Sequence, residues 1–477
     1  MIAKERTVFT DTLQYRCMVS EKGRDMALLI SAAAIGNFLI AFDMNMLNIA
    51  LPTITSEFDL DIATSTWLVI VHGIILCSLL LPFGRAGDVI GHRRLFLTGI
   101  SLFGLANLAA GLSIVFEDFI ILVFLRSLSA IGAAMMLSVN FAIISSNLPM
   151  GMRGRGLGYS AVFGSLGFMT GPIVSGLLLT FFQWNSLFIL LAVIASIGLL
   201  LGLKVIPESG GSGVSADTIQ TVAFFLTVLF LVLAINRYLI DGPSMLVSIS
   251  ATFAIVSAVV VIWREKVSKH PLLDPDLIFE PRVILPLISM SLLFMCFSGM
   301  MVLLPFYLEY VRQMETAAIG MMFIIPAIII TFLGPASGKA SDVHGSYRLT
   351  LMAAGVMVVS MLFFLSIERI DLTAVALVGL VFMGISYGGF NAPNNRRVFC
   401  SVSLDRMGAA SGMHQTMRHI GNVLGAATMP AVYQVVAGPT PSVGMMVNGF
   451  QASFLVGLFF ALMALIVSAS IRKDCRV

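Results

Sequence analysis

Long apolar stretches separated by short polar segments dominate this chain. A helix that crosses about 30 Å of hydrocarbon needs roughly 20 apolar residues, and fourteen runs of about this length occur between charged or turn residues. Their hydrophobic positions are continuous, which favours helices over the alternating strands of a membrane barrel. We therefore predict an all-α integral membrane protein with 14 transmembrane helices. The predicted spans are 27–51, 65–83, 95–115, 119–145, 157–182, 187–205, 219–235, 246–263, 283–306, 317–337, 349–367, 372–390, 408–435 and 447–470.

Composition supports a membrane location. Hydrophobic residues make up 58% of the 477 residues and charged residues 11%, against roughly 25% charged in soluble domains. The net charge of only +3 provides no basic surface for nucleic acid. Five scattered cysteines show no metal-ligand spacing, so we expect neither a metal site nor a cofactor.

Basic residues predict the orientation of the helices. With a cytoplasmic amino terminus, most of the 28 Lys and Arg residues fall on the cytoplasmic side. Only Arg237, Arg312 and Arg369 fall outside, and only Arg126 and Arg418 lie within spans. This asymmetry follows the positive-inside rule and predicts two cytoplasmic termini.

The sequence also contains an internal repeat. Gly84, Asp88 and Gly91 follow the second span, and residues of the same three types recur 254 positions later at Gly338, Asp342 and Gly345. The same offset relates a glycine pair in the fifth span to a pair in the thirteenth. Parallel halves of this kind characterise a class of secondary transporters.

The repeat suggests a division of the chain into five parts. Residues 1–24 form a cytoplasmic amino-terminal segment, and 25–206 and 282–471 form two six-helix bundles. A linker with two extra transmembrane helices occupies 207–281, and 472–477 form a cytoplasmic tail.

Four motifs resemble the major facilitator superfamily, specifically its fourteen-helix drug/proton antiporters of the multidrug efflux type. Residues 43–52 read DMNMLNIALP, close to that family's DxTIVNVALP, and 84–94 read GRAGDVIGHRR, similar to the superfamily's loop signature. Residues 126–134, RSLSAIGAA, resemble RxxQGxGAA, and 167–176, GFMTGPIVSG, resemble the motif associated with exporters.

Three positions depart from these motifs. Val89 stands where the loop signature usually has Arg, Asn45 replaces the usual Thr, and Ser129 and Ala130 replace Gln-Gly. These departures weaken the roles carried over to single residues more than they weaken the resemblance itself.

The resemblance implies a transporter of the cell (plasma) membrane and not an enzyme. It implies a proton-coupled antiporter that works by alternating access, acts as a monomer and exports small amphipathic or cationic compounds, with the proton gradient as its energy source. A proton-coupled symporter for uptake of a small metabolite is the main alternative. A membrane-embedded enzyme is a weaker one, because no catalytic cluster is visible in the sequence.

The first candidate site is the acidic residue of the first span. Asp43 is the only acidic residue well inside any predicted span, and a carboxylate there must face water, pair or take a proton. Arg126 in the fourth span lies at a similar depth. In the resembled fold both helices line the central cavity, so we expect an Asp43–Arg126 proton-coupling pair, with a fixed structural ion pair as the alternative.

The repeated loops are candidate gates. Glycine permits a tight turn, and the resemblance implies that Asp88 approaches the start of the thirteenth helix and holds the cytoplasmic side closed. A solvated basic loop is the alternative, but it does not explain the repeated spacing. The predicted gating residues are Gly84, Asp88, Gly91, Arg93, Arg94, Gly338 and Asp342.

Small residues of the fifth and thirteenth spans are predicted to pack the two helices together. Gly167, Gly171 and Gly176 allow close approach and Pro172 introduces a bend, and the repeat suggests Gly421 and Gly425 as their partners. Such a tight apolar seam would limit leakage during exchange.

Four further polar residues lie within spans and remain candidates for substrate binding or an inner gate. They are Asn48, His72, His414 and Arg418. For His72 a proton relay and a hydrogen-bonded packing role are both open, and Asn48 can also bond neighbouring helices. His414 and Arg418, four residues apart, share one helix face, and they can equally bind lipid phosphate.

Overall fold

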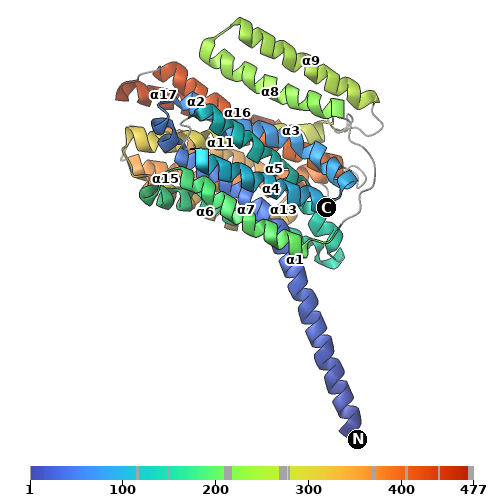
Figure 1. The fold of residues 1–477 in the computed structure, drawn as a ribbon. Helices are drawn as coiled ribbons and strands as arrows, with labels where there is room; N and C mark the ends of the chain where they lie inside the picture. The colour runs from blue at the N-terminus through green and yellow to red at the C-terminus, as the bar shows by residue number, and fades with distance from the viewer. Residues whose placement is uncertain are drawn as a thin grey trace.

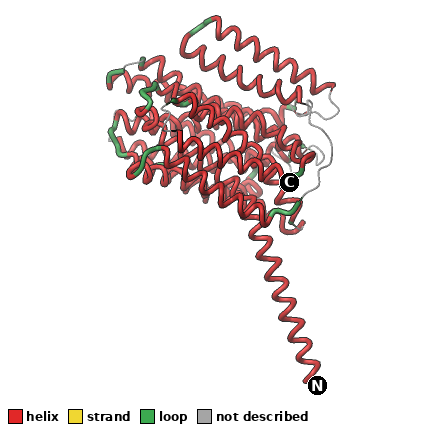
Figure 2. Tube along the Cα trace, in the orientation of Figure 1, coloured by secondary structure: helices red, strands yellow, loops and turns green. Residues whose placement is uncertain are grey.

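Helices form all the regular structure of the described part of the chain (Figures 1 and 2). The computed structural model describes residues 2–113, 118–148, 150–208, 218–267, 277, 280–366, 372–402, 407–438 and 441–470. The first half contains α1 (Ile2–Glu57), α2 (Ile62–Ser65), α3 (Trp67–Ile90), α4 (His92–Leu112), α5 (Phe119–Asn147), α6 (Met150–Phe181) and α7 (Asn185–Val205).

Two helices follow, and then the second half. The pair consists of α8 (Thr218–Asp241) and α9 (Met245–Val267). The second half contains α11 (Pro281–Phe306), the π-helix η2 (Tyr307–Val311), α12 (Thr316–Met322), α13 (Ile324–His344), α14 (Ser346–Leu365), α15 (Leu372–Phe399), α16 (Met407–Ala437) and α17 (Val443–Ser470).

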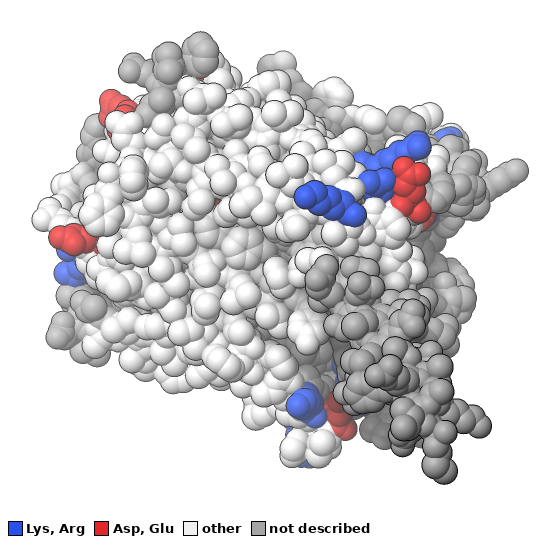
Figure 3. Space-filling view, turned by 60° about the horizontal axis from the view of Figure 1, so that its bottom comes forward, with Lys and Arg blue, Asp and Glu red and all other residues white. Residues whose placement is uncertain are grey.

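Fourteen helical spans in the described residues are long and apolar enough to cross a membrane, so the predicted number is confirmed. Two spans are interrupted by a break, one between α2 and α3 and one between α12 and α13. The ninth span continues through η2 to Val311, five residues beyond its predicted end. On the face drawn in Figure 3, charged side chains are few and a wide central area has none, as a lipid-facing surface requires.

The two halves repeat the same helix neighbours. In the first half α1 packs on α6, α4 on α5 and α3 on α5. The corresponding pairs of the second half are α11 with α16, α14 with α15 and α13 with α15. The predicted pair of six-helix bundles is therefore confirmed, whereas the residue boundaries of the five-part division stay a prediction.

The repeated loops share one backbone turn. Gly91 ends α3 with φ of 100°, and Gly345 ends α13 with φ of 81°. Side chains with a Cβ rarely adopt this conformation, which explains why glycine occurs at both positions of the repeat.

The predicted packing of the fifth span on the thirteenth is wrong. A Cβ at Gly167 would collide with the carbonyl of Phe38, and one at Gly171 with that of Phe42. The glycine stripe of α6 thus faces α1 in its own half. Symmetry still holds, because Gly421 and Gly425 face Ser291 and Met295 of α11 in the same way. The repeat reproduces a contact within each half, and the spacing alone could not distinguish this from a contact between halves.

The inserted pair, α8 and α9, forms a hairpin along one side of the molecule (Figure 1). Helix α8 contacts α3 of the first half and α16 of the second. The Asn236 amide donates a 3.3 Å hydrogen bond to the Ala427 carbonyl in α16. The hairpin therefore lies across a seam between the two bundles.

The close α1–α6 packing predicts a strong effect of bulk at Gly167. Gly167→Val should lower the free energy of unfolding by about 3 kcal/mol, since overpacking displaces backbone on both helices. Thermal unfolding of the purified protein in detergent measures the effect. Gly158→Val is the matched control on α6, because none of the described residues from other parts of the chain comes within 4 Å of a Cβ placed there. Equal midpoints for the two variants would contradict the packing role.

Candidate functional site

A buried ion pair lies inside the first bundle. Nη1 of Arg126 on α5 donates hydrogen bonds of 2.7 and 2.9 Å to the two carboxylate oxygens of Asp43 on α1. Both residues are buried, with exposed fractions of 0% for Asp43 and 1% for Arg126. The guanidinium also stacks over the ring of Phe188 from α7, 5.9 Å from its centroid. The two residues predicted to pair are thus brought together by three helices.

His72 lies next to this pair. Its Nδ1 is 3.8 Å from Oδ2 of Asp43, and the side chain is 1% exposed. Neither ring nitrogen has a hydrogen-bond partner among the described residues. An imidazole always presents at least one N–H, so burial without partners carries a free-energy cost that usually needs a reason.

A central cavity of about 380 Å³ lies between the two bundles. Both halves contribute to its wall, and the lining combines apolar side chains with amides and hydroxyls. Arg418 is the one Lys, Arg, Asp or Glu residue among the lining residues. The polar lining residues are Asn37, Asn45, Asn48, Ser165, Ser298, Thr331, Tyr387, Asn391, Gln415, Arg418, His419 and Asn422.

Asp43, Arg126 and His72 are not part of this lining. Helix α1 presents Ile40, Met44 and Asn48 to the cavity at four-residue spacing, and Asp43 points instead to α5. In this conformation the ion pair therefore lies outside the cavity wall, although both of its helices line the cavity. The sequence gives the depth of Asp43, but the face that it occupies depends on how α1 is rotated in the bundle.

His414 and Arg418 occupy different surroundings. The Arg418 guanidinium lines the cavity and stacks over Phe294, 5.7 Å from the ring centroid. It forms no ion pair with an acidic residue of the described chain. His414 is outside the lining and packs against Phe399, with ring centroids 5.8 Å apart. Asn48 and Arg418 are therefore placed to contact a substrate in the cavity, whereas His414 is not.

The bundles contact each other closely on the side predicted to face outward. A Cβ at Gly320 would lie 2.5 Å from the Pro172 carbonyl, and one at Gly176 would lie 3.0 Å from that of Thr316. The Tyr310 hydroxyl donates a 3.0 Å hydrogen bond to the Pro52 carbonyl. These contacts form an outer seal, and the cavity lies on its predicted cytoplasmic side. The first residues of the exporter-type motif, Gly167 and Gly171, thus pack on α1, and its last residue, Gly176, packs on α12.

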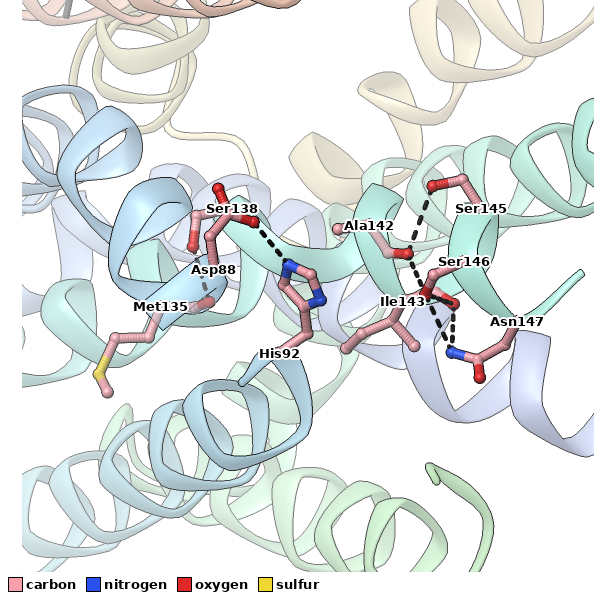
Figure 4. Close-up of polar contacts among 9 residues, drawn as sticks. All are labelled: Asp88, His92, Met135, Ser138, Ala142, Ile143, Ser145, Ser146 and Asn147. Atoms are coloured by element: carbon pink, nitrogen blue, oxygen red, sulfur yellow. Dashed lines mark hydrogen bonds and ion pairs between the residues drawn. The ribbon is translucent and has the colours of Figure 1, made fainter. Parts of the chain in front are cut away.

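The repeated loops have different partners. In the first, Asp88 contacts His92 of the same loop at 3.1 Å beside α5 (Figure 4). In the second, Asp342 pairs with Arg396 from α15 at 3.5 Å. The position 254 residues before Arg396 is Ala142, so α5 offers no equivalent cation.

The remaining gate candidates have various surroundings. Arg93 donates a 2.9 Å hydrogen bond to the carbonyl of Leu203 in α7. It also pairs at 3.2 Å with Glu208, which follows that helix. Arg94 is exposed. Among the described residues, no neighbour lies within 4 Å of a Cβ placed at Gly84, and a Cβ at Gly338 lies 3.5 Å from that of Ala392. The start of the thirteenth span falls on residues 403–409, whose side chains lie outside the described part, so the contact predicted for Asp88 there stays a prediction.

The sequence did not predict one acidic residue within a membrane span. Glu309 lies in η2, and its Oε2 is buried with no hydrogen-bond partner among the described residues. The predicted span ended at 306, although Tyr307 to Val311 continue the apolar pattern on both sides of the glutamate. π-Helical turns of this kind are frequent at functional sites.

Fold and cavity together define a secondary transporter with two bundles around a central site. The family model of the Major Facilitator Superfamily matches residues 33–426, and the chain belongs to this superfamily. It is thus a multi-pass membrane protein of a transporter family that binds small-molecule substrates, and not an enzyme.

The known proteins similar to this chain are named for different substrates. The chain is 25% identical over 407 residues to the riboflavin transporter RibZ of Clostridioides difficile, covering 84% of this chain and 86% of RibZ. It is 28% identical over 426 residues to the multidrug efflux pump LfrA of Mycolicibacterium smegmatis, covering 86% and 83%. The crystal structure of a D-xylose-proton symporter has the same fold, with a TM-score of 0.68, 15% identity and coverage of 94% and 98%.

The ion pair predicts strongly non-additive stability effects. Asp43→Asn or Arg126→Met alone leaves one buried charge without its partner and should cost about 3–5 kcal/mol in unfolding free energy. The double variant should lose much less than the sum of the two. A double-mutant cycle on thermal or denaturant unfolding in detergent tests this. Additive losses would mean that the two side chains do not stabilise each other.

The outer seal predicts that bulk at Gly320 shifts the protein away from the conformation described here. Gly320→Val should reduce the labelling of Ser165→Cys from the predicted cytoplasmic side by about tenfold, since closing the seal would cost about 1.4 kcal/mol more. An impermeant maleimide is used on a background with the five native cysteines replaced. Gly334→Val is the control in the same span, because a Cβ placed there meets no atom of the described neighbouring residues within 4 Å. Equal labelling in both would show that the seal does not control access.

Proposed function

We propose that the protein is a proton-coupled antiporter that exports small amphipathic compounds from the cytoplasm across the plasma membrane. In this proposal the chain acts as a monomer with both termini in the cytoplasm. The proposal rests mainly on one observation, the buried Asp43–Arg126 pair one helix face away from the central cavity.

Asp43 is the proposed coupling residue. A carboxylate at this depth is stable when it is paired or protonated, and here it is paired with Arg126. Protonation would remove its attraction to the guanidinium, so proton binding and the arrangement of α1 and α5 are linked. Such a linkage between a proton and the arrangement of two helices is what an antiporter requires.

The cavity favours an amphipathic compound. Its wall offers Met44, Phe168 and Phe297 for apolar groups and several amides for polar ones. A volume of about 380 Å³ lies within the usual range for small-molecule sites. A cationic compound would need a carboxylate, and in this proposal Asp43 serves cations only after α1 turns it toward the cavity.

Alternating access would use the two ends of the molecule in turn. The outer seal at Pro172, Gly176 and Gly320 is closed here. In the opposite conformation we expect it to open, with the loops at Gly84–Gly91 and Gly338–Gly345 holding the cytoplasmic side. Because the glycine stripes pack within each half, each bundle can move as a rigid unit.

The similarity to LfrA, a multidrug efflux pump, and the exporter-type motif support export. Uptake by symport is the second candidate, and the cavity gives it a specific argument: an amide-rich wall with Arg418 also suits a polar or anionic metabolite. RibZ is named as a riboflavin transporter. The direction of proton-driven transport distinguishes the two.

Reconstituted vesicles test the proposal. An imposed proton gradient should drive uphill transport of at least one compound from a panel of cationic, neutral and anionic aromatic molecules, in the direction opposite to proton flow. Asp43→Asn should abolish this uphill transport, because the amide keeps the shape of the side chain but does not exchange a proton.

Substrate exchange without a gradient serves as the internal control. Asp43→Asn should retain part of this exchange, which shows that the variant folds and binds. Undiminished uphill transport by Asp43→Asn would contradict the coupling role, and movement of substrate in the same direction as protons would favour the symporter.

A further inference from the structure

The ion pair poses a problem of access. Asp43 is fully buried and lies outside the lining of the central cavity. A carboxylate that exchanges protons needs a chain of donors and acceptors that reaches water. Two buried histidines lie at the two ends of this gap: His72 is 3.8 Å from Asp43, and His419 is part of the cavity lining.

The two histidines come from different bundles. His72 is on α3 in the first half, and His419 is on α16 in the second. Helices α3 and α16 pack against each other, and Gly73 beside His72 meets Val423, one turn after His419. The packing of α3 on α16 therefore places the two histidines on helices that face each other across the seam.

Both rings lack the partners that a structural role would provide. His72 is 1% exposed and His419 is 3% exposed. None of their four ring nitrogens has a hydrogen-bond partner in the described chain. A histidine that only fills space usually satisfies its N–H group, whereas a proton carrier needs one nitrogen to receive the proton and the other to release it.

We propose that His72 and His419 form a proton relay between Asp43 and the central cavity. The relay rests on the proposed function, because it supplies the proton path that a coupled transporter needs. The carboxyl proton of Asp43 passes to Nδ1 of His72, and the O–H bond breaks as the N–H bond forms. His72 then releases the proton from Nε2, and His419 takes it up and passes it to water in the cavity. The 3.8 Å gap between His72 and Asp43 must shorten by about 1 Å for the first transfer.

The charges around the two histidines disfavour a proton that stays on either ring. The groups that act on His72 are Asp43 on α1, Arg126 on α5 and His419. Those that act on His419 are Arg418 and His414 of its own helix. A proton held on either ring would lie near a guanidinium, and the repulsion returns it to Asp43 or passes it to water. Because the path crosses the seam, it is complete only when α3 and α16 are in contact.

Proton exchange at Asp43 can be measured without knowing the substrate. The full-length protein is reconstituted in liposomes, and the infrared carbonyl band of the protonated carboxyl is followed after a rapid change of pH. Loss of the band in Asp43→Asn assigns it. His72→Gln and His419→Gln should each slow its change by about 100-fold, and the double variant should be no slower than the slower single variant.

His414→Gln is the matched control. His414 is also a buried histidine of α16, but it lies outside the cavity lining, so its loss removes only a weak charge effect on His419 and should change the rate by no more than about twofold. Added imidazole should restore the rate in His419→Ala, where the ring faced the cavity, but not in His72→Ala, where the site is closed. This rescue also keeps the test valid if His72 variants fold poorly.

Each outcome decides one question. Wild-type rates in both His72→Gln and His419→Gln would overturn the relay while leaving proton coupling intact. An equal slowing in His414→Gln, or no rescue of His419→Ala by imidazole, would also overturn it. If the wild-type protein shows no band that depends on Asp43, proton coupling through Asp43 fails and the relay fails with it.

Discussion

A carboxylate and a guanidinium that share two short hydrogen bonds in a water-poor interior constrain much of the first bundle. Neither Asp43 nor Arg126 can be left alone there without a cost of several kcal/mol. The pair therefore fixes how α1 and α5 are rotated, and the rotation of α1 decides that Asn48 faces the cavity and Asp43 does not. It also ties stability to function, because any event that neutralises one partner must be matched by a rearrangement nearby.

The helices and their repeat could be predicted because the bilayer imposes a simple rule of length and hydrophobicity. Contacts between side chains of different helices were harder to predict. Asp43 and Arg126 were paired correctly from their equal depth, since buried charges have few ways to be satisfied. Gly167 and Gly421 were assigned to each other wrongly, because glycine signals a close approach without naming the helix approached. His419 could not be predicted as a site residue from the sequence, since its importance arises only from its position across the seam from His72.

The two halves share their architecture but differ in polar chemistry. The turns at Gly91 and Gly345 are alike, whereas Asp342 has Arg396 from α15 as a partner and Asp88 has a neighbour in its own loop. The second half thus joins its loop to a neighbouring helix through the Asp342–Arg396 ion pair. The ion pair inside the first bundle has no counterpart at the same offset, since the residues 254 positions after Asp43 and Arg126 are Phe297 and Leu380. The repeat preserves the backbone packing and the loop aspartate, but not the buried ion pair.

The α8–α9 hairpin has a consequence for compounds that dissolve in the bilayer. Helix α8 contacts both α3 and α16, and it covers from the lipid side the seam where the two bundles meet. The other seam, between α6 and α13, has no such covering helix among the described elements that contact it. The protein therefore presents two unlike flanks to the membrane. An apolar molecule that diffuses sideways in the lipid meets a screened flank on one side and an uncovered junction of the described elements on the other, so any lateral entry would be confined to that second side.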